Sequence, residues 1–156
     1  IDERYQRGLV RGIVHDERAW QLGGVAGHAG LFSTATDLVH YAQMMINRGF
    51  YGGRRYFKRS TIENFTTRQE MSPGSERALG WDTPSEEGSL AGDFFSPGSY
   101  GHTGFTGTSM WIDPKRKIAV ILLTNHVYPS RGKKAEMREV RRAFQNGVMQ
   151  ILLQDN

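Results

Sequence analysis

A histidine and a threonine stand among three closely spaced glycines between residues 99 and 107, and this group is the part of the chain best suited to chemistry. The glycines, at positions 101, 104 and 107, leave one face of the backbone without side chains, so that a ligand or a second chain is able to approach it closely. His102 and Thr103 place hydrogen-bonding groups beside that open backbone. We therefore expect this strand edge to bind a carboxylate or a carbonyl oxygen.

The elements that must position this group form an antiparallel meander. We predict strands over residues 99–103, 107–113 and 117–125, with a turn at Asp113-Pro114. The run from Ile118 to Thr124 is nearly all apolar, which predicts a strand that is buried on both faces and central in its sheet. A helix from about Lys133 to Leu153 follows, and we expect it to turn these apolar positions inward: Met137, Val140, Phe144, Val148, Ile151 and Leu152. An antiparallel sheet covered by helices is an α+β fold.

Shorter elements precede the meander. Ser33 or Thr34 is placed to cap a helix that ends at Gly49, and its apolar stripe consists of Leu38, Tyr41, Ala42, Met45 and Ile46. The sequence of residues 51–56 predicts a tight turn or a hairpin. The sequence from Ser60 to Glu63 has capping-box spacing and predicts a short helix that turns Ile62 and Phe65 inward. Residues 78–82 predict a short strand between two loops.

Composition excludes several classes of function. The 156 residues fit one domain, and the absence of cysteine excludes disulfides and thiolate metal sites. No apolar run approaches the roughly 18 residues that a membrane span needs. The basic residues between 131 and 142 alternate with Glu136 and Glu139, so we interpret them as a solvated helix face; the alternative is a surface for nucleic acid or another anionic polymer.

Metal and cofactor sites are not expected. None of the five histidines has the spacing of a zinc site, and the glycine-rich loop at residues 23–30 lacks the Gly-Lys-Ser/Thr ending of a phosphate cradle. His28 lies in that loop. Two readings of it stay open: its ring faces a cleft and binds substrate, or it satisfies the loop backbone.

A complete nucleophilic site is also missing from the sequence. The chain contains one Ser-x-x-Lys pattern, Ser130 to Lys133, but proline, glycine and charged residues surround it, so we interpret Ser130 as the turn and cap before the last helix. No Tyr-x-Asn or Ser-x-Asn triplet and no Gly-x-Ser-x-Gly elbow occurs.

Several motifs together resemble those of the class C β-lactamase-related serine hydrolases, which include D,D-peptidases, D-aminopeptidases and esterases. They are, in chain order, residues 24–45, Leu79-Gly80-Trp81, Gly101-His102-Thr103-Gly104, Trp111-Ile112-Asp113-Pro114, residues 118–125 and the final helix. In that family the order is Ser-x-x-Lys, Tyr-x-Asn, then Lys- or His-Thr-Gly, and only the third motif stands here. The resemblance implies that residues 1–156 are the C-terminal part of a β-lactamase/transpeptidase-like domain whose N-terminal part precedes Ile1.

The resemblance also implies a mechanism and its residues. A serine outside this chain forms an acyl-enzyme on a peptidoglycan-like peptide, a β-lactam or an ester, and the Phe105 N–H supplies one oxyanion donor. His102 orients the hydroxyl network, Thr103 binds the substrate carboxylate or amide, and Gly104 and His28 belong to the substrate site.

The resemblance further implies a periplasmic or extracellular place. We expect two partners besides the substrate, the missing N-terminal portion and a second copy of the chain. We expect no nucleic acid, no cofactor and no membrane span. The alternative to an enzyme fragment is a non-catalytic ligand-binding or structural module derived from the same fold.

Overall fold

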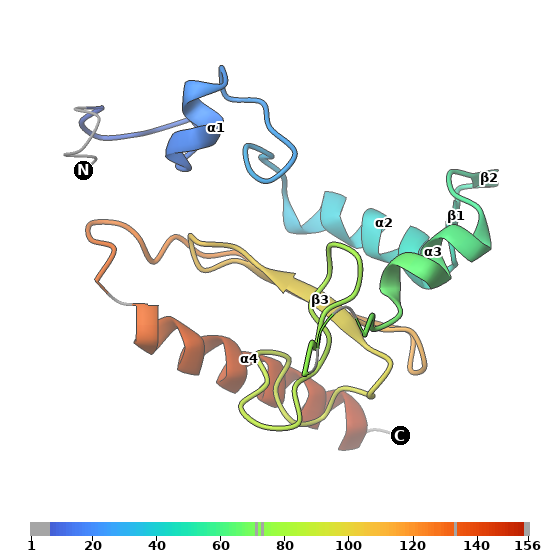
Figure 1. The fold of residues 1–156 in the computed structure, drawn as a ribbon. Helices are drawn as coiled ribbons and strands as arrows, with labels where there is room; N and C mark the ends of the chain where they lie inside the picture. The colour runs from blue at the N-terminus through green and yellow to red at the C-terminus, as the bar shows by residue number, and fades with distance from the viewer. Residues whose placement is uncertain (1–6, 71, 73, 133, 155–156) are drawn as a thin grey trace.

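The computed structural model describes residues 7–70, 72, 74–132 and 134–154. A three-stranded sheet lies between helices on its two faces (Figure 1). The strands are β3 (Tyr100–Thr103), β4 (Ser109–Asp113) and β5 (Ile118–Leu122), all antiparallel and in the order β3-β4-β5. The predicted meander is therefore confirmed, with β4 at its centre. No described helix combines the length and the apolarity needed to cross a bilayer.

The position predicted for the most apolar strand is wrong. β5 is an edge strand of the described sheet, because it pairs with β4 and with no other described strand. Of its five residues only Val120 is buried. An apolar run shows that both faces of a strand meet apolar neighbours, but it does not determine which strands flank it.

Alternation along the strands gives the sheet two cores. On one face, Tyr100 and Ile112 pack against Ala42 and Met45 of α2 (Ala35–Ile46). On the other face, Trp111 and Val120 pack against Met149 of α4 (Lys134–Gln154). Since side chains of a strand alternate between faces, a slip of one residue in β4 would exchange the contents of the two cores.

The face of α4 that meets the sheet differs from the predicted one. Its buried residues are Met137, Arg141, Gln145 and Met149, which recur every fourth position. Val148 packs against the α4-side core, whereas Val140, Phe144, Ile151 and Leu152 are exposed. The apolar periodicity therefore predicted the helix correctly but placed its inward face about one position from the true one. The reason is that two of the buried residues are polar and meet polar groups of β4 and its turn. Lys133, the predicted first residue, lies outside the described residues.

The elements before the sheet follow the sequence in part. Thr34 caps α2 by accepting the Asp37 N–H at 3.2 Å, and Gly49 follows the helix with a φ of 88°. The predicted hairpin is formed by β1 (Phe50–Tyr51) and β2 (Arg54–Arg55), which pair through a two-glycine turn. Among the residues described ahead of α2, one short helix forms, α1 (Glu17–Gln21).

Four local predictions are wrong. α3 (Arg59–Thr66) begins one residue before Ser60 and has no side-chain cap. Phe65 and Tyr41 are exposed, and Met44 is buried instead. Residues 78–82 form a tight turn rather than a strand, since the Ala78 N–H donates to the Trp81 carbonyl at 2.9 Å.

A fully buried carboxylate fixes the far end of β4. Asp113 accepts hydrogen bonds from the Ser96 N–H at 3.1 Å and the Ser96 hydroxyl at 2.8 Å, and Arg116 Nη1 lies 2.8 Å away. Its other oxygen accepts the backbone N–H groups of Lys115 and Arg116. Burial raises the pKa of the Asp113 carboxyl, but the bonds from Arg116 and Ser96 outweigh it and leave the pKa below its usual range.

We predict that Asp113→Asn lowers the free energy of unfolding by about 1–3 kcal/mol, because the neutral amide cannot accept all the hydrogen bonds that the buried carboxylate accepts from Ser96, Lys115 and Arg116. Because the folded-state pKa is lowered, the carboxylate's contribution is complete above its unfolded pKa of about 3.9 and is lost as the pH falls through the folded value. Urea unfolding from pH 7 to pH 3 measures both effects. The exposed Glu70→Gln is the matched control. Equal stability of D113N and wild type at pH 7 would contradict this account.

Candidate functional site

The end of β3 carries the residues singled out in the sequence. His102 is exposed, and its Nδ1 lies 2.9 Å from the carbonyl oxygen of Thr103. Because a carbonyl only accepts, Nδ1 donates there, and Nε2 is left to accept from Arg77 Nη2 at 3.4 Å. Arg77 also forms an ion pair with Asp82 at 2.5 Å. The imidazole is therefore oriented by its own strand on one side and by a loop cation on the other.

The outer edge of β3 is only partly paired. Asp82 and Gly101 exchange both backbone hydrogen bonds, at 2.8 and 2.9 Å. Alternation turns the backbone groups of Thr103 to the same edge, beyond the end of this bridge. Phe105 follows two residues after Thr103, and its N–H group has no acceptor among the described residues. The edge therefore offers a backbone donor to a ligand close to His102 and Thr103.

The backbone at the glycines of this segment is not open to a ligand, which differs from the prediction. A Cβ at Gly101 would collide with the Trp111 ring and the Met110 carbonyl, and one at Gly104 would collide with the Thr108 hydroxyl. At Gly107, whose φ is 107°, it would meet the Thr124 hydroxyl. These glycines allow the protein to pack against itself, and the space beside them is already occupied.

The Phe105 side chain lies at the tip of the β3–β4 turn and is 60% exposed. His15 stacks on its ring with the centroids 5.6 Å apart, and the Arg131 guanidinium lies 5.7 Å from the ring centroid. Arg131 forms an ion pair with Glu17 at 2.5 Å, and His126 Nε2 donates to the Phe105 carbonyl at 2.8 Å. The segment around α1 therefore reaches the turn that follows the His-Thr-Gly motif.

His28 has a local partner. Its Nε2 lies 2.9 Å from the carboxylate of Asp16, which also caps α1 by accepting the Ala19 N–H at 2.8 Å. The Ala19 bond and the His28 contact hold the pKa of Asp16 below its usual range. No hydrogen bond or ring contact among the described residues joins His28 to β3, so its substrate-binding role stays a prediction.

Sequence reasoning missed two arginines of this region. Arg77 lies in a loop and carried no signal. Arg141 was assigned to a solvated face, but it is 7% exposed and donates to the carbonyls of Gly104, Gly107 and Thr108. Its spacing one turn from Met137, an apolar position, was the available signal. The described residues contain no group of three or more histidine or acidic side chains placed to hold a metal.

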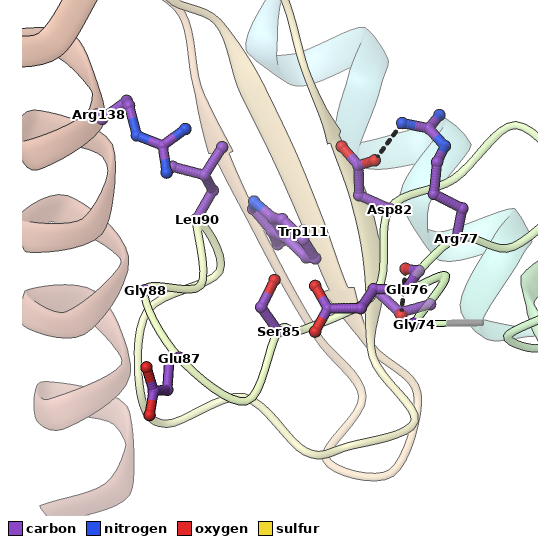
Figure 2. Close-up of a pocket in the computed structure, with 11 residues that line it drawn as sticks. Gly74, Glu76, Arg77, Asp82, Ser85, Glu87, Gly88, Leu90, Trp111 and Arg138 are labelled. Carbon is purple, nitrogen blue, oxygen red and sulfur yellow. Dashed lines mark hydrogen bonds and ion pairs between the residues drawn. The ribbon is translucent and has the colours of Figure 1, made fainter. Parts of the chain in front are cut away.

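A pocket of about 390 Å³ lies beside the bridge of Asp82 and Gly101. Figure 2 shows Trp111 in this pocket between Arg138 of α4 and the ion pair of Arg77 and Asp82. The indole Nε1 of Trp111 is buried and has no acceptor among the described residues. Arg77 connects the pocket to His102, because its guanidinium reaches both.

Comparison with known proteins decides the family. The family model described as "Beta-lactamase" matches residues 2–143. The chain belongs to the β-lactamase family. Proteins from Salmonella gallinarum and Salmonella typhi, provisionally named D-alanyl-D-alanine carboxypeptidases, are 43% identical to it over 117 residues. The match takes in 73% of this chain and 27% of each relative, so the chain spans about a quarter of their length.

Solved structures agree on the fold. A β-lactamase from Mycobacterium bovis superposes with a TM-score of 0.58, at 23% identity, over 78% of this chain and 45% of its own. A protein from Bacillus anthracis, provisionally named 6-aminohexanoate-dimer hydrolase, gives a TM-score of 0.56 at 23% identity, over 81% of this chain and 31% of its own. The β-lactamase fold inferred from the His-Thr-Gly segment and its flanking motifs is confirmed.

We predict that Gly101→Ala destabilises this member of the family by about 1–3 kcal/mol, because the added methyl group must displace the Trp111 ring or the β4 backbone. Thermal and urea unfolding measure the loss. Gly98→Ala is the matched control, since its Cβ would meet open space at an ordinary φ. Equal stability of the two variants would show that the backbone at Gly101 is open after all.

Proposed function

We propose that this chain is the C-terminal part of an acyl-transfer serine hydrolase and contributes one wall of its active site. The observation that carries the proposal is the outer edge of β3, where the unpartnered Phe105 N–H follows His102 and Thr103. An N–H without an internal acceptor is the kind of donor that an oxyanion requires. The short match to longer relatives supports a further segment that carries the nucleophile.

The reaction divides between the two parts of the domain. A serine hydroxyl from the other segment adds to the substrate carbonyl, and the carbonyl oxygen takes up the negative charge. The Phe105 N–H donates to that oxygen, which gains most when the charge is fully formed. The leaving amine departs with a proton, and water then cleaves the acyl ester. His102 orients the hydroxyl groups, and Thr103 donates to the substrate carboxylate or amide.

A peptide that ends in D-alanyl-D-alanine is the substrate we propose first. The relatives from Salmonella bear a carboxypeptidase name for that dipeptide. The site residues fit its C-terminal carboxylate, because the Thr103 hydroxyl and the nearby Arg77 guanidinium are both donors. Such peptides belong to cell-wall material, so we place the protein in the periplasm or outside the cell. β-Lactams and esters are the other acyl donors to test.

We predict that His102→Ala in the longer protein lowers turnover about 100-fold, since it removes the imidazole that orients the hydroxyl groups, and misplaced reacting groups typically cost about that much. Release of D-alanine from a D-alanyl-D-alanine peptide measures turnover, and the thermal midpoint of the same variant measures folding.

His40→Ala is the matched control, because His40 is exposed on α2. Wild-type turnover in the His102 variant would remove the site assignment. Residues 1–156 alone are expected to release no D-alanine, and turnover by them would contradict the division into two parts. A longer protein that binds these peptides without cleaving them would support the non-catalytic module instead.

The missing segment also explains two exposed surfaces. The outer edge of β5 is unpaired among the described strands, and α4 exposes Val140, Phe144 and Ile151 along the flank of its sheet-facing side. Open strand edges and contiguous apolar surface favour association. We propose that the other part of the domain covers these surfaces in the longer protein.

We predict that residues 1–156 alone form dimers or larger species through the same surfaces. Light scattering at rising concentration measures the mass. Ile151→Glu is expected to lower the association, whereas the adjacent control Gln150→Glu is expected to leave it unchanged. A wild-type chain that stays monomeric at high concentration would contradict this prediction.

A further inference from the structure

The buried guanidinium of Arg141 holds the turn between β3 and β4. Its Nε donates to the Gly107 carbonyl at 3.1 Å, and Nη2 donates to the carbonyls of Gly104 and Thr108, the latter at 3.2 Å. All three acceptors belong to the five residues that join the strands. A single side chain therefore fixes both sides of a turn that has only two backbone hydrogen bonds of its own, from Gly104 to Thr108 and from Gly107 to Gly104.

Arginine suits this role because its donors form a rigid planar fork. One set of N–H groups reaches three carbonyls that point to a common centre, which a lysine ammonium on a flexible stem would not match. No carboxylate contacts Arg141 among the described residues, so carbonyl dipoles compensate the buried charge. Burial, with a smaller effect of Arg138, lowers the pKa of Arg141.

The rest of α4 fixes where this guanidinium lies. One turn before it, Met137 Sδ lies next to Gly107, and one turn after it, Gln145 Nε2 donates to the Ser109 hydroxyl at 3.4 Å. Met149 then packs with Trp111 in the α4-side core. Residues at every fourth position of α4 thus contact successive positions of the turn and of β4, which sets the helix register against the strand.

We propose that Arg141 is a positioning residue for catalysis: by holding the carbonyls of Gly104, Gly107 and Thr108, it fixes the orientation of the intervening Phe105 N–H toward the reacting carbonyl. This inference rests on the proposed function. Arg141 touches no reacting atom. A backbone donor acts on an oxyanion only if its peptide plane is set before the reaction, because reorientation during the reaction would cost part of the stabilisation.

The first experiment uses this chain and needs no substrate. Arg141→Met removes the charge and the fork at similar length, Arg141→Lys keeps the charge, and Arg142→Met is the matched control, since Arg142 is partly exposed and pairs with Asp93 at 2.7 Å. Amide hydrogen exchange at Gly104 and Gly107 is expected to become at least tenfold faster in R141M, intermediate in R141K and unchanged in R142M. Exchange in the middle of β4 reports global folding.

The second experiment measures D-alanine release by the longer protein. R141M is expected to lower kcat about 10- to 100-fold with KM nearly unchanged, less than complete loss of one oxyanion donor, which costs about 100- to 1,000-fold. R141K is expected to keep a kcat between those of R141M and wild type. The control R142M is expected to keep the wild-type kcat.

The outcomes separate the two proposals. Unchanged exchange at Gly104 and Gly107 in R141M would overturn the anchoring role, whatever the activity. Faster exchange with normal kcat, while His102→Ala is impaired, would overturn the positioning role and leave the proposed function standing. An inactive wild-type protein would overturn the proposed function and the catalytic role of Arg141 together, although the exchange result would still show the anchor. If R141M does not fold, the exchange rates and kcat of R141K are compared with those of R142M instead, and the same outcomes apply.

Discussion

The contact between the Arg141 guanidinium and the carbonyls of the β3–β4 turn is the interaction on which the candidate site depends. The turn contains two of the three glycines of the motif, and glycine-rich backbone has high conformational entropy to lose. A buried cation that binds three carbonyls offsets part of that loss. It also ties the turn to the longest helix of the chain, so the position of Phe105 follows from the packing of α4 on the sheet.

Buried charges fix both ends of the central strand. Arg141 contacts the turn before β4, and Asp113 closes the turn after it with hydrogen bonds from Ser96, Lys115 and Arg116. Each charge meets groups of opposite partial charge, because carbonyl oxygens surround the Arg141 cation and N–H groups surround the Asp113 carboxylate. Between them, Trp111 and Ile112 enter opposite cores. The register of β4 is therefore defined by polar contacts at its ends and by apolar packing between them.

The sequence predicted the meander, the Asp113-Pro114 turn, the cap at Thr34 and the long last helix because each depends on local spacing or on turn chemistry. It failed where the deciding contacts are distant in sequence. The inward face of α4 was misassigned because Arg141 and Gln145 are polar. Only their partners in the β3–β4 turn and at Ser109, 33 to 37 residues earlier, make their burial favourable. The edge position of β5 was missed because an apolar pattern does not report strand order. At the candidate site, the motif located His102, Thr103 and Phe105 in sequence, but Arg77 reaches His102 across 25 residues and carried no local signal.

The His-Thr-Gly segment shows why a motif alone does not establish catalysis in this chain. Gly101 and Gly104 are required by Trp111 and Thr108, whose atoms fill the space of a Cβ, and these requirements hold in any protein that keeps the fold. A non-catalytic descendant would therefore retain the glycines. The structure makes no such demand on the Thr103 hydroxyl, which has no hydrogen-bond partner among the described residues, and it uses the His102 ring only in two exposed contacts. Catalytic function in this chain must then be sought in these two side chains and in the Phe105 N–H, which has no acceptor among the described residues.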